Sequence, residues 1–230
     1  GLTMDSKCPD ETTILRFRHL LEKNGLDKQV FELQEVAHDR GLLFSKGTIA
    51  DGSFIEAPSS TKNADKKRDP EMHSAKKGSN RHFGMKMHIG VDKVTGIIHT
   101  VVTTPARLMF TCDKADELRR PDEREVIGDS GYLGMEKRES ADPEHVTYTA
   151  AKRYSRRKKL SAERVAEEKV LSSIRCRVEH AFHRIKVRFG YKKVRYRGLA
   201  KNTARLTMLP SIANMFIGNC FEIRTKVSFV

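Results

Sequence analysis

Hydrophobic and polar positions alternate strictly in the middle of the chain. The alternating apolar positions are Phe83, Met85, Met87, Ile89 and Val91. A period of two predicts a β-strand, and the β-branched run at 97–104 predicts a second strand after a turn at 92–96. The two strands are therefore expected to form an antiparallel hairpin.

Three shorter apolar runs predict further strands. Residues 47–55 are rich in β-branched side chains and place Asp51 inside or at the end of a strand. Residues 125–128 form a short apolar run that ends at Asp129, as expected of a buried strand. Residues 146–150 predict one more strand. The polar stretch 58–81 has almost no apolar residue and predicts a long surface loop, which is typically either functional or disordered.

Helical signals dominate the two ends of the chain. Asp10 before Glu11-Thr12-Thr13 is a capped helix start, and Asn24-Gly25 is a stop signal. A second helix is expected at 27–40, and the polar segment 113–124 is compatible with helix.

The strongest helix is expected at 161–189. Its apolar residues are spaced by three or four: Leu171, Ile174, Val178, Phe182, Ile185 and Phe189. At about 100° per residue, Glu179 lies roughly 100° from the centre of that stripe, and Arg175 and Lys186 lie within about 40° of Glu179. An acid flanked by two cations thus borders the core-facing stripe. The order of all these elements predicts a mixed α/β sheet with helices packed on it.

Charge is distributed unevenly along the chain. Residues 151–230 contain 21 Lys+Arg against 5 Asp+Glu, a net of +16, whereas residues 1–150 contain 23 against 25, a net of -2. Clustered cations attract phosphate and release its counterions, so this pattern favours a nucleic-acid partner. A solvated basic face and an RNA-binding tail are the alternatives.

Several classes of protein are disfavoured by the sequence. No run approaches the roughly 18 apolar residues of a membrane span, and the start shows no signal-peptide pattern, so a cytosolic protein is predicted. The four cysteines, at 8, 112, 176 and 220, have neither zinc-ligand spacing nor a disulfide framework.

Asp51, Asp129 and Glu179 are candidate metal ligands. Magnesium prefers hard oxygen ligands, and two-metal phosphoryl transfer needs carboxylates that converge from separate elements. Two acids on strands and one on a helix suit that chemistry. The alternative is a turn aspartate, a strand-end aspartate and a surface glutamate paired with Arg175.

Six ordered motifs resemble the DDE transposases of bacterial insertion sequences, specifically the insertion-sequence-five family. They are ADGSFIEAPSSTKN at 50–63, RDPEMH at 68–73, KKG at 76–78, FGMKMHIGVD at 83–92, GDSGY at 128–132 and RCRVEHAF at 175–182. PDETTIL at 9–15 and FGY at 189–191 fit as well. The resemblance runs in order from about residue 9 to 217.

The resemblance implies a ribonuclease-H-like fold with Asp51, Asp129 and Glu179 as the acids that hold Mg²⁺, or alternatively Mn²⁺. The family also has an arginine four residues before the glutamate and a lysine seven after it, which Arg175 and Lys186 match. Arg175 would orient Glu179, and Lys186 would contact a DNA phosphate. The alternative for each is an i,i+4-type surface pair. Some relatives have a tyrosine at the position of Ser172, so that residue's role is not transferred.

The implied activity is metal-dependent cleavage at the transposon end followed by strand transfer into target DNA. The implied partners are the inverted-repeat ends and target DNA, with a possible homodimer on the DNA, in the bacterial cytosol and on the nucleoid when bound. The expected backbone contacts are Lys62, Lys76, Lys77, Lys86, Lys152, Arg153, Arg156, Arg157 and Lys158. A solvated surface role is the alternative for each of them.

Departures from the family suggest a second possibility. Relatives continue after Thr104 toward a His-Asp pair, whereas this chain has Pro105-Ala106-Arg107-Leu108-Met109-Phe110. The chain starts at Gly1, where relatives already have an N-terminal region thought to bind transposon ends. We expect a helical segment at 1–46, a catalytic domain at 47–217 and an atypical tail at 218–230. A truncated or decayed, catalytically silent DNA-binding remnant is the alternative function.

Overall fold

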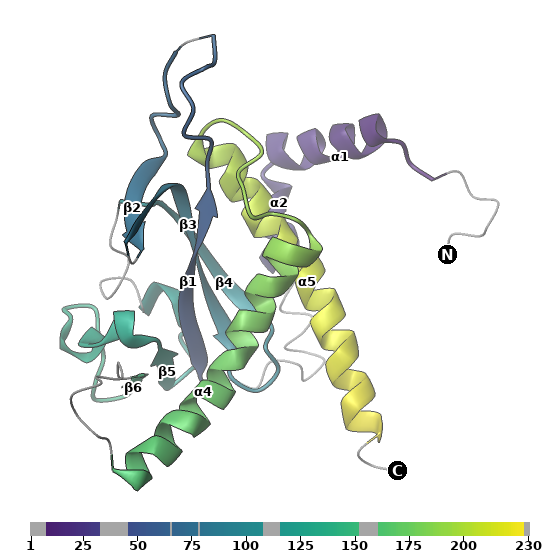
Figure 1. Cartoon of the computed structure of the whole chain (residues 1–230). Helices are drawn as coiled ribbons and strands as arrows, with labels where there is room; N and C mark the ends of the chain where they lie inside the picture. The colour runs from purple at the N-terminus through teal and green to yellow at the C-terminus, as the bar shows by residue number, and fades with distance from the viewer. Residues whose placement is uncertain are drawn as a thin grey trace.

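A mixed six-stranded sheet with helices packed against it forms the centre of the computed structural model (Figure 1). The structure describes residues 8–32, 46–64, 66–77, 79–107, 116–151 and 161–227, and the side chains of most of these. The strands are β1 Thr48–Glu56, β2 His73–Lys77, β3 Asn80–Asp92, β4 Ile98–Pro105, β5 Glu125–Gly128 and β6 Thr147–Ala150.

Strand pairing places β1 at the middle of the sheet. β1 pairs antiparallel with β3 on one side and parallel with β5 on the other, and β6 continues the parallel part beyond β5. β2 and β4 both pair with β3, β2 with its first half and β4 with its second half. This is the mixed, ribonuclease-H-like α/β arrangement that the sequence predicted.

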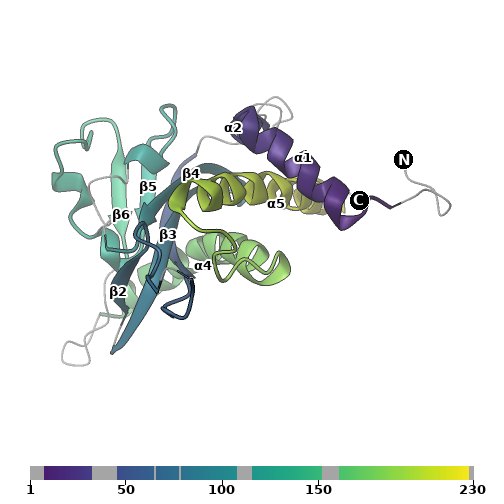
Figure 2. The same cartoon turned by 90° about the horizontal axis from the view of Figure 1, so that it is seen from above.

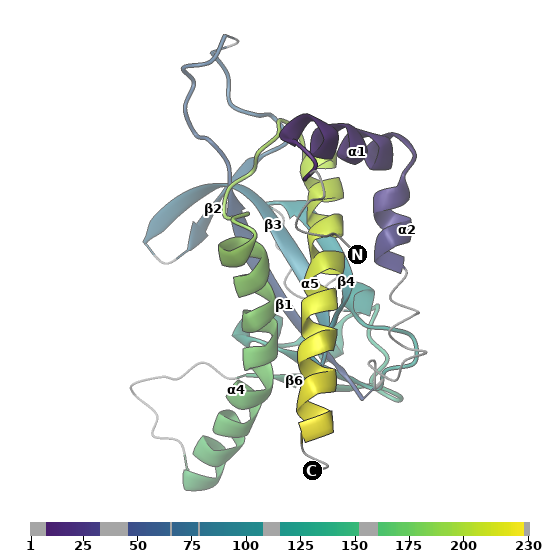
Figure 3. The same cartoon turned by 90° about the vertical axis from the view of Figure 1, so that its right-hand side faces the viewer.

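One face of the sheet is covered by α4 Ala162–His183 and α5 Leu199–Val227, which run side by side across it (Figures 2 and 3). Apolar side chains from that face and from both helices form the main core. Its members include Ile49, Ile55, Met85, Met87, Ile89, Val178, Phe182, Ile185, Leu206 and Leu209. The spacing of three and four along α4 thus does bury its stripe, as expected of an amphipathic helix.

A smaller core lies on the other face of the sheet. Ala50 and Val126 pack there against Leu118, Tyr132 and Met135. These three come from single turns of 3-10 helix, at Asp116–Leu118, Ser130–Tyr132 and Met135–Lys137. The expected helix at 113–124 is therefore reduced to one turn within the part that the structure describes.

The N-terminal helices are α1 Glu11–Lys23 and α2 Leu26–Glu32. Asp10 caps α1, because its side chain accepts a hydrogen bond from the Thr13 backbone N–H at 2.7 Å. α2 packs against α5. The rest of the second helix expected at 27–40 lies outside the described residues.

Two expectations differ from the structure. The segment 58–81 is not loop throughout, because β2 and the start of β3 lie inside it. Their Lys, Ser and His side chains alternate on an exposed edge, which explains why composition alone indicated loop. The long helix α5 was not predicted, and it continues across position 217, where the sequence suggested the end of a domain.

Candidate active site

Asp51 lies in β1 on the face of the sheet that α4 covers. Side chains of a strand alternate between faces, and Ile49 and Ile55, two and four residues away, both belong to the core beneath α4. The Asp51 side chain is 18% exposed, and its Oδ1 accepts a hydrogen bond from the Gly52 N–H at 2.7 Å. Asp51 is thus a carboxylate set into the edge of an apolar layer.

Asp129 follows β5, the parallel neighbour of β1. Ala50 is opposite Gly128 in the register, so one further residue along each strand brings Asp51 and Asp129 to adjacent positions. The Asp129 side chain accepts a hydrogen bond from the Gly131 N–H at 2.8 Å and caps the 3-10 turn that follows. The strand order of the sheet therefore brings the first two predicted acids together.

The third acid, Glu179, is on α4, together with Arg175. A guanidinium nitrogen of Arg175 lies 3.6 Å from Oδ2 of Asp51, and both side chains are about one-fifth exposed. Nε of Arg175 is buried and has no hydrogen-bond partner among the described residues. Arg175 thus contacts Asp51 rather than forming only a surface pair with Glu179.

The carboxylate of Asp51 is held in an unusual electrostatic environment. Its pKa is raised to about 6, chiefly because burial disfavours the charged form. The charges of Asp129 and Glu179 raise it further, while the Gly52 hydrogen bond and Arg175 lower it. Asp51 is thus near enough to Asp129 and to Glu179 for their charges to act on it.

This donor set suits a hard divalent cation in its chemistry. All three ligands would be carboxylate oxygens, and a cation among them would offset both the burial of the Asp51 charge and its repulsion by Asp129 and Glu179. Among the described residues, however, no three Asp, Glu, His or Cys side chains are close enough to form a ready ligand group. Arg175 instead supplies the positive charge next to Asp51.

Lys186 reaches the same strand from the end of α4. Its Nζ donates a hydrogen bond to Oγ of Ser53 at 2.9 Å, two residues beyond Asp51. Lys186 lies in a π-helical turn, Arg184–Arg188, that continues α4, and such wide turns frequently occur at functional sites. The structure thus brings Arg175 and Lys186 to the strand that carries Asp51.

A cleft of about 460 Å³ opens between this end of α4 and the outer half of β1. β5 pairs with β1 only as far as Ala50, so the edge of β1 is not covered by β5 beyond that point. Hydrogen bonds between Glu56 and the backbone of Lys192 and Val194 close the far end. The cleft is lined by Phe54, Glu56, His82, Glu179, Phe182, His183, Lys186, Val187, Lys192 and Lys193.

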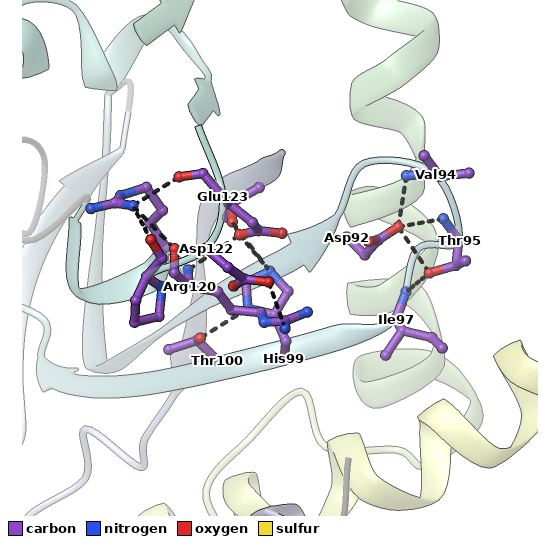
Figure 4. Close-up of polar contacts among 12 residues, drawn as sticks. Asp92, Val94, Thr95, Ile97, His99, Thr100, Arg120, Asp122 and Glu123 are labelled. Carbon is purple, nitrogen blue, oxygen red and sulfur yellow. Dashed lines mark hydrogen bonds and ion pairs between the residues drawn. The ribbon is translucent and has the colours of Figure 1, made fainter. Parts of the chain in front are cut away.

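A buried polar network joins the starts of the two acid-bearing strands, and Figure 4 labels two of its members, His99 and Glu123. The Thr48 hydroxyl donates to Glu123, and it also lies 3.3 Å from Nε2 of His99. The side chains of His99 and Glu123 are almost completely buried. Burial lowers the pKa of His99 to about 3, with help from Arg120, and burial raises the pKa of Glu123. Sequence reasoning missed this network, because its members lie far apart in the chain.

The predicted DNA-contacting residues differ in their exposure to solvent. Lys62 and Lys76 are exposed, while Lys86 is half-buried on the sheet face opposite to Asp51, and burial lowers its pKa. The side chain of Lys77 and the whole basic stretch from Lys152 to Lys158 lie outside the described residues. Residues 108–110 of the departing segment 105–110 also lie outside the described residues.

The fold and the site together define a class: ribonuclease-H-like domains with carboxylates on two adjacent strands and a packed helix. Comparison with known families agrees. Residues 43–215 match the family described as the transposase DDE domain, which covers most of the chain. The chain therefore belongs to this family, whose activity is metal-dependent and acts on DNA. No solved structure matches the chain. Over the described residues, no helix is both long and apolar enough to cross a membrane.

Proposed function

We propose that this protein is an insertion-sequence transposase that cleaves the ends of its element and joins them to target DNA with the help of Mg²⁺. The single observation that carries the proposal is the juxtaposition of Asp51 and Asp129 on parallel neighbours, with Glu179 close enough to raise the pKa of Asp51. These three acids would hold the metal, and Mn²⁺ would be an alternative to Mg²⁺.

Bound metal would supply charge stabilisation at the reacting phosphate and activation of the attacking oxygen. The residues of the chain have separate tasks. Arg175 holds Asp51 in place from α4, and its charge offsets the repulsion among the acids. Lys186, fixed on Ser53, places a cation beside the cleft where a DNA phosphate next to the cut would lie.

The basic surface would bind the DNA largely without regard to sequence. Lys62 and Lys76 on the described surface, and the cations from Lys152 to Lys158, are the proposed backbone contacts. The proposed setting is the bacterial cytosol, with the element's inverted repeats and target DNA as partners and with pairing of two copies on the DNA.

A second candidate is a catalytically silent remnant that keeps the fold and binds DNA. It is supported by the ion pair of Arg175 with Asp51, and by the lack of a three-ligand group among the described acids. The Pro105 to Phe110 departure from the family pattern supports it as well.

A cleavage assay separates the two candidates. The substrate is duplex DNA carrying the inverted repeats that flank the gene, incubated with Mg²⁺ or with EDTA. An active transposase nicks at the repeat end only with metal, and Asp51→Asn, Asp129→Asn and Glu179→Gln each abolish nicking while DNA binding remains. Glu167→Gln is the matched control, because Glu167 is exposed on the same helix as Glu179. Failure of the unaltered chain to cut favours the remnant, and cutting by the three variants would refute the assigned acids.

A further inference from the structure

A second cleft, of about 360 Å³, lies at the end of the sheet beyond the active site. One wall is the loop that follows β1, and the other is the connection between the π turn and α5; both meet at the same end of the molecule (Figure 1). Its lining residues are Ala57, Pro58, Ser60, Lys62, Asn63, Arg68, Asp69, Val194, Arg195, Tyr196 and Arg197.

The lining is strongly cationic. Lys62 and Arg68 come from the loop after β1, and Arg195 and Arg197 come from the opposite wall; all four are exposed. The lining contains one acid, Asp69, whose Oδ2 accepts a hydrogen bond from the Gly198 N–H at 2.7 Å, so the four cations still outnumber the acidic charge. Four cations around one hollow favour a ligand with several negative charges.

The loop is held in shape by its own polar contacts. Nε of Arg68 donates to the Ser59 carbonyl at 2.8 Å. Asn63 and Lys67 exchange two hydrogen bonds, at 2.7 and 3.1 Å. Glu71 accepts a hydrogen bond from the backbone N–H of Leu199, which joins the loop to the first turn of α5. The two walls are therefore connected before any ligand binds.

The opposite wall is also anchored. The ring of Tyr196 lies 4.4 Å from the guanidinium carbon of Arg18, and the two side chains are hydrogen-bonded. Because Arg18 belongs to α1, that helix supports this wall. A preorganised cationic hollow loses little conformational entropy when it binds an anion. This favours binding at a defined site over non-specific electrostatic attraction.

We propose that this cleft is a second contact for the duplex that the active site cuts, and that it binds backbone phosphates about six base pairs from the cut. The proposal rests on the proposed transposase function. β1 leads directly from one site to the other, from Asp51 to Ala57, and six strand residues span about 20 Å. A duplex rises about 3.4 Å per base pair, so that span corresponds to about six base pairs. The cleft that contains Lys186, Lys192 and Lys193 lies between the two sites.

Binding of neutralised duplexes tests the proposal without any need for catalysis. The probe is a set of fluorescent duplexes of the flanking inverted repeat, each carrying one uncharged methylphosphonate, titrated in EDTA. For the unaltered chain, the largest loss of affinity is expected about six base pairs from the end of the repeat. For Lys62→Gln/Arg195→Gln, affinity for the unmodified duplex should fall about tenfold, and the slope of log affinity against log salt should become shallower by about 1 to 2. The position-specific loss should disappear.

The matched control is Arg164→Gln/Lys169→Gln, which removes the same charge from exposed positions at the far end of α4. It should retain the position-specific loss. A loss that is equal at every position, or one that persists in Lys62→Gln/Arg195→Gln, would overturn the proposal. Absence of Mg²⁺-dependent cutting would bear only on the proposed function, since these titrations contain no metal.

Discussion

The imidazole of His88 packs directly over Gly52, so that a Cβ added to Gly52 would lie 2.6 Å from Nδ1 of His88. The two residues are opposite each other in the β1 and β3 register, and His88 is buried. His88 is also 3.3 Å from the Thr104 hydroxyl, which limits how far the ring can withdraw. The backbone next to Asp51 therefore depends on a glycine.

We expect Gly52→Ala to lower the free energy of unfolding by about 1 to 3 kcal/mol, because the ring of His88 fills the space that the added methyl group would need. Urea titration measures this change. In a His88→Ala background the same substitution should cost much less. Equal costs in both backgrounds would show that the His88 contact is not the cause.

Asp51→Asn should stabilise the metal-free protein near neutral pH. The pKa of Asp51 is raised to about 6 in the folded state, so its ionised form costs folding free energy above that pH, and this cost disappears below about pH 4. The expected gain is roughly 1 to 3 kcal/mol near pH 7 and close to zero near pH 4. Urea unfolding in EDTA at the two pH values measures it, and a gain that is independent of pH would contradict it.

His99 should make the fold sensitive to acid. Its pKa is lowered to about 3 in the folded state, so the unfolded chain binds the extra proton first and stability falls as pH drops below about 6.5. His99→Gln should reduce the slope of the free energy of unfolding against pH in this range by up to about 1.4 kcal/mol per pH unit. Glu123→Gln is the comparison, because the raised pKa of Glu123 has the opposite sign and favours folding at lower pH. Unchanged acid sensitivity in His99→Gln would assign it to other groups.

DNA binding by the whole chain should depend steeply on salt. The net +16 of residues 151–230 would neutralise several phosphates, each adding about 0.9 to the slope of log affinity against log salt. Anisotropy titrations with an unrelated duplex should give nearly the same slope as the inverted repeat, because phosphate contacts do not read sequence. A flat salt response would refute this prediction.

Local sequence patterns were sufficient to predict the elements in which buried residues recur at a regular spacing. Alternation from Phe83 to Val91 predicted β3, and the apolar spacing of α4 predicted which face meets the sheet. Asp51 lies inside β1 and Asp129 follows β5 directly, and the pairing of these two strands brings the acids to adjacent positions. The spacing of apolar residues along one strand or helix involves only neighbouring residues, so it can be recognised in a single sequence.

Such local patterns could not predict contacts between residues that lie far apart in the sequence. The network of Thr48, His99 and Glu123 joins three separate segments, and nothing near any one of them in the sequence marks the other two. The cleft around Arg195 likewise requires the loop after β1 to bond to the start of α5. α5 was missed because the apolar residues in 199–227 do not follow a clear helical stripe.

The π turn at Arg184–Arg188 alters what the spacing between Glu179 and Lys186 means. In a regular α-helix, seven residues return a side chain to nearly the same face, so the count alone would stack Lys186 above Glu179. Here the Phe189 N–H bonds to the Arg184 carbonyl, five residues back, and the turn is wider. Sequence distance along this helix is therefore not a direct measure of angle. A regular helix with the same spacing would direct the lysine elsewhere, so the local winding of the helix as well as the motif sets where this cation lies.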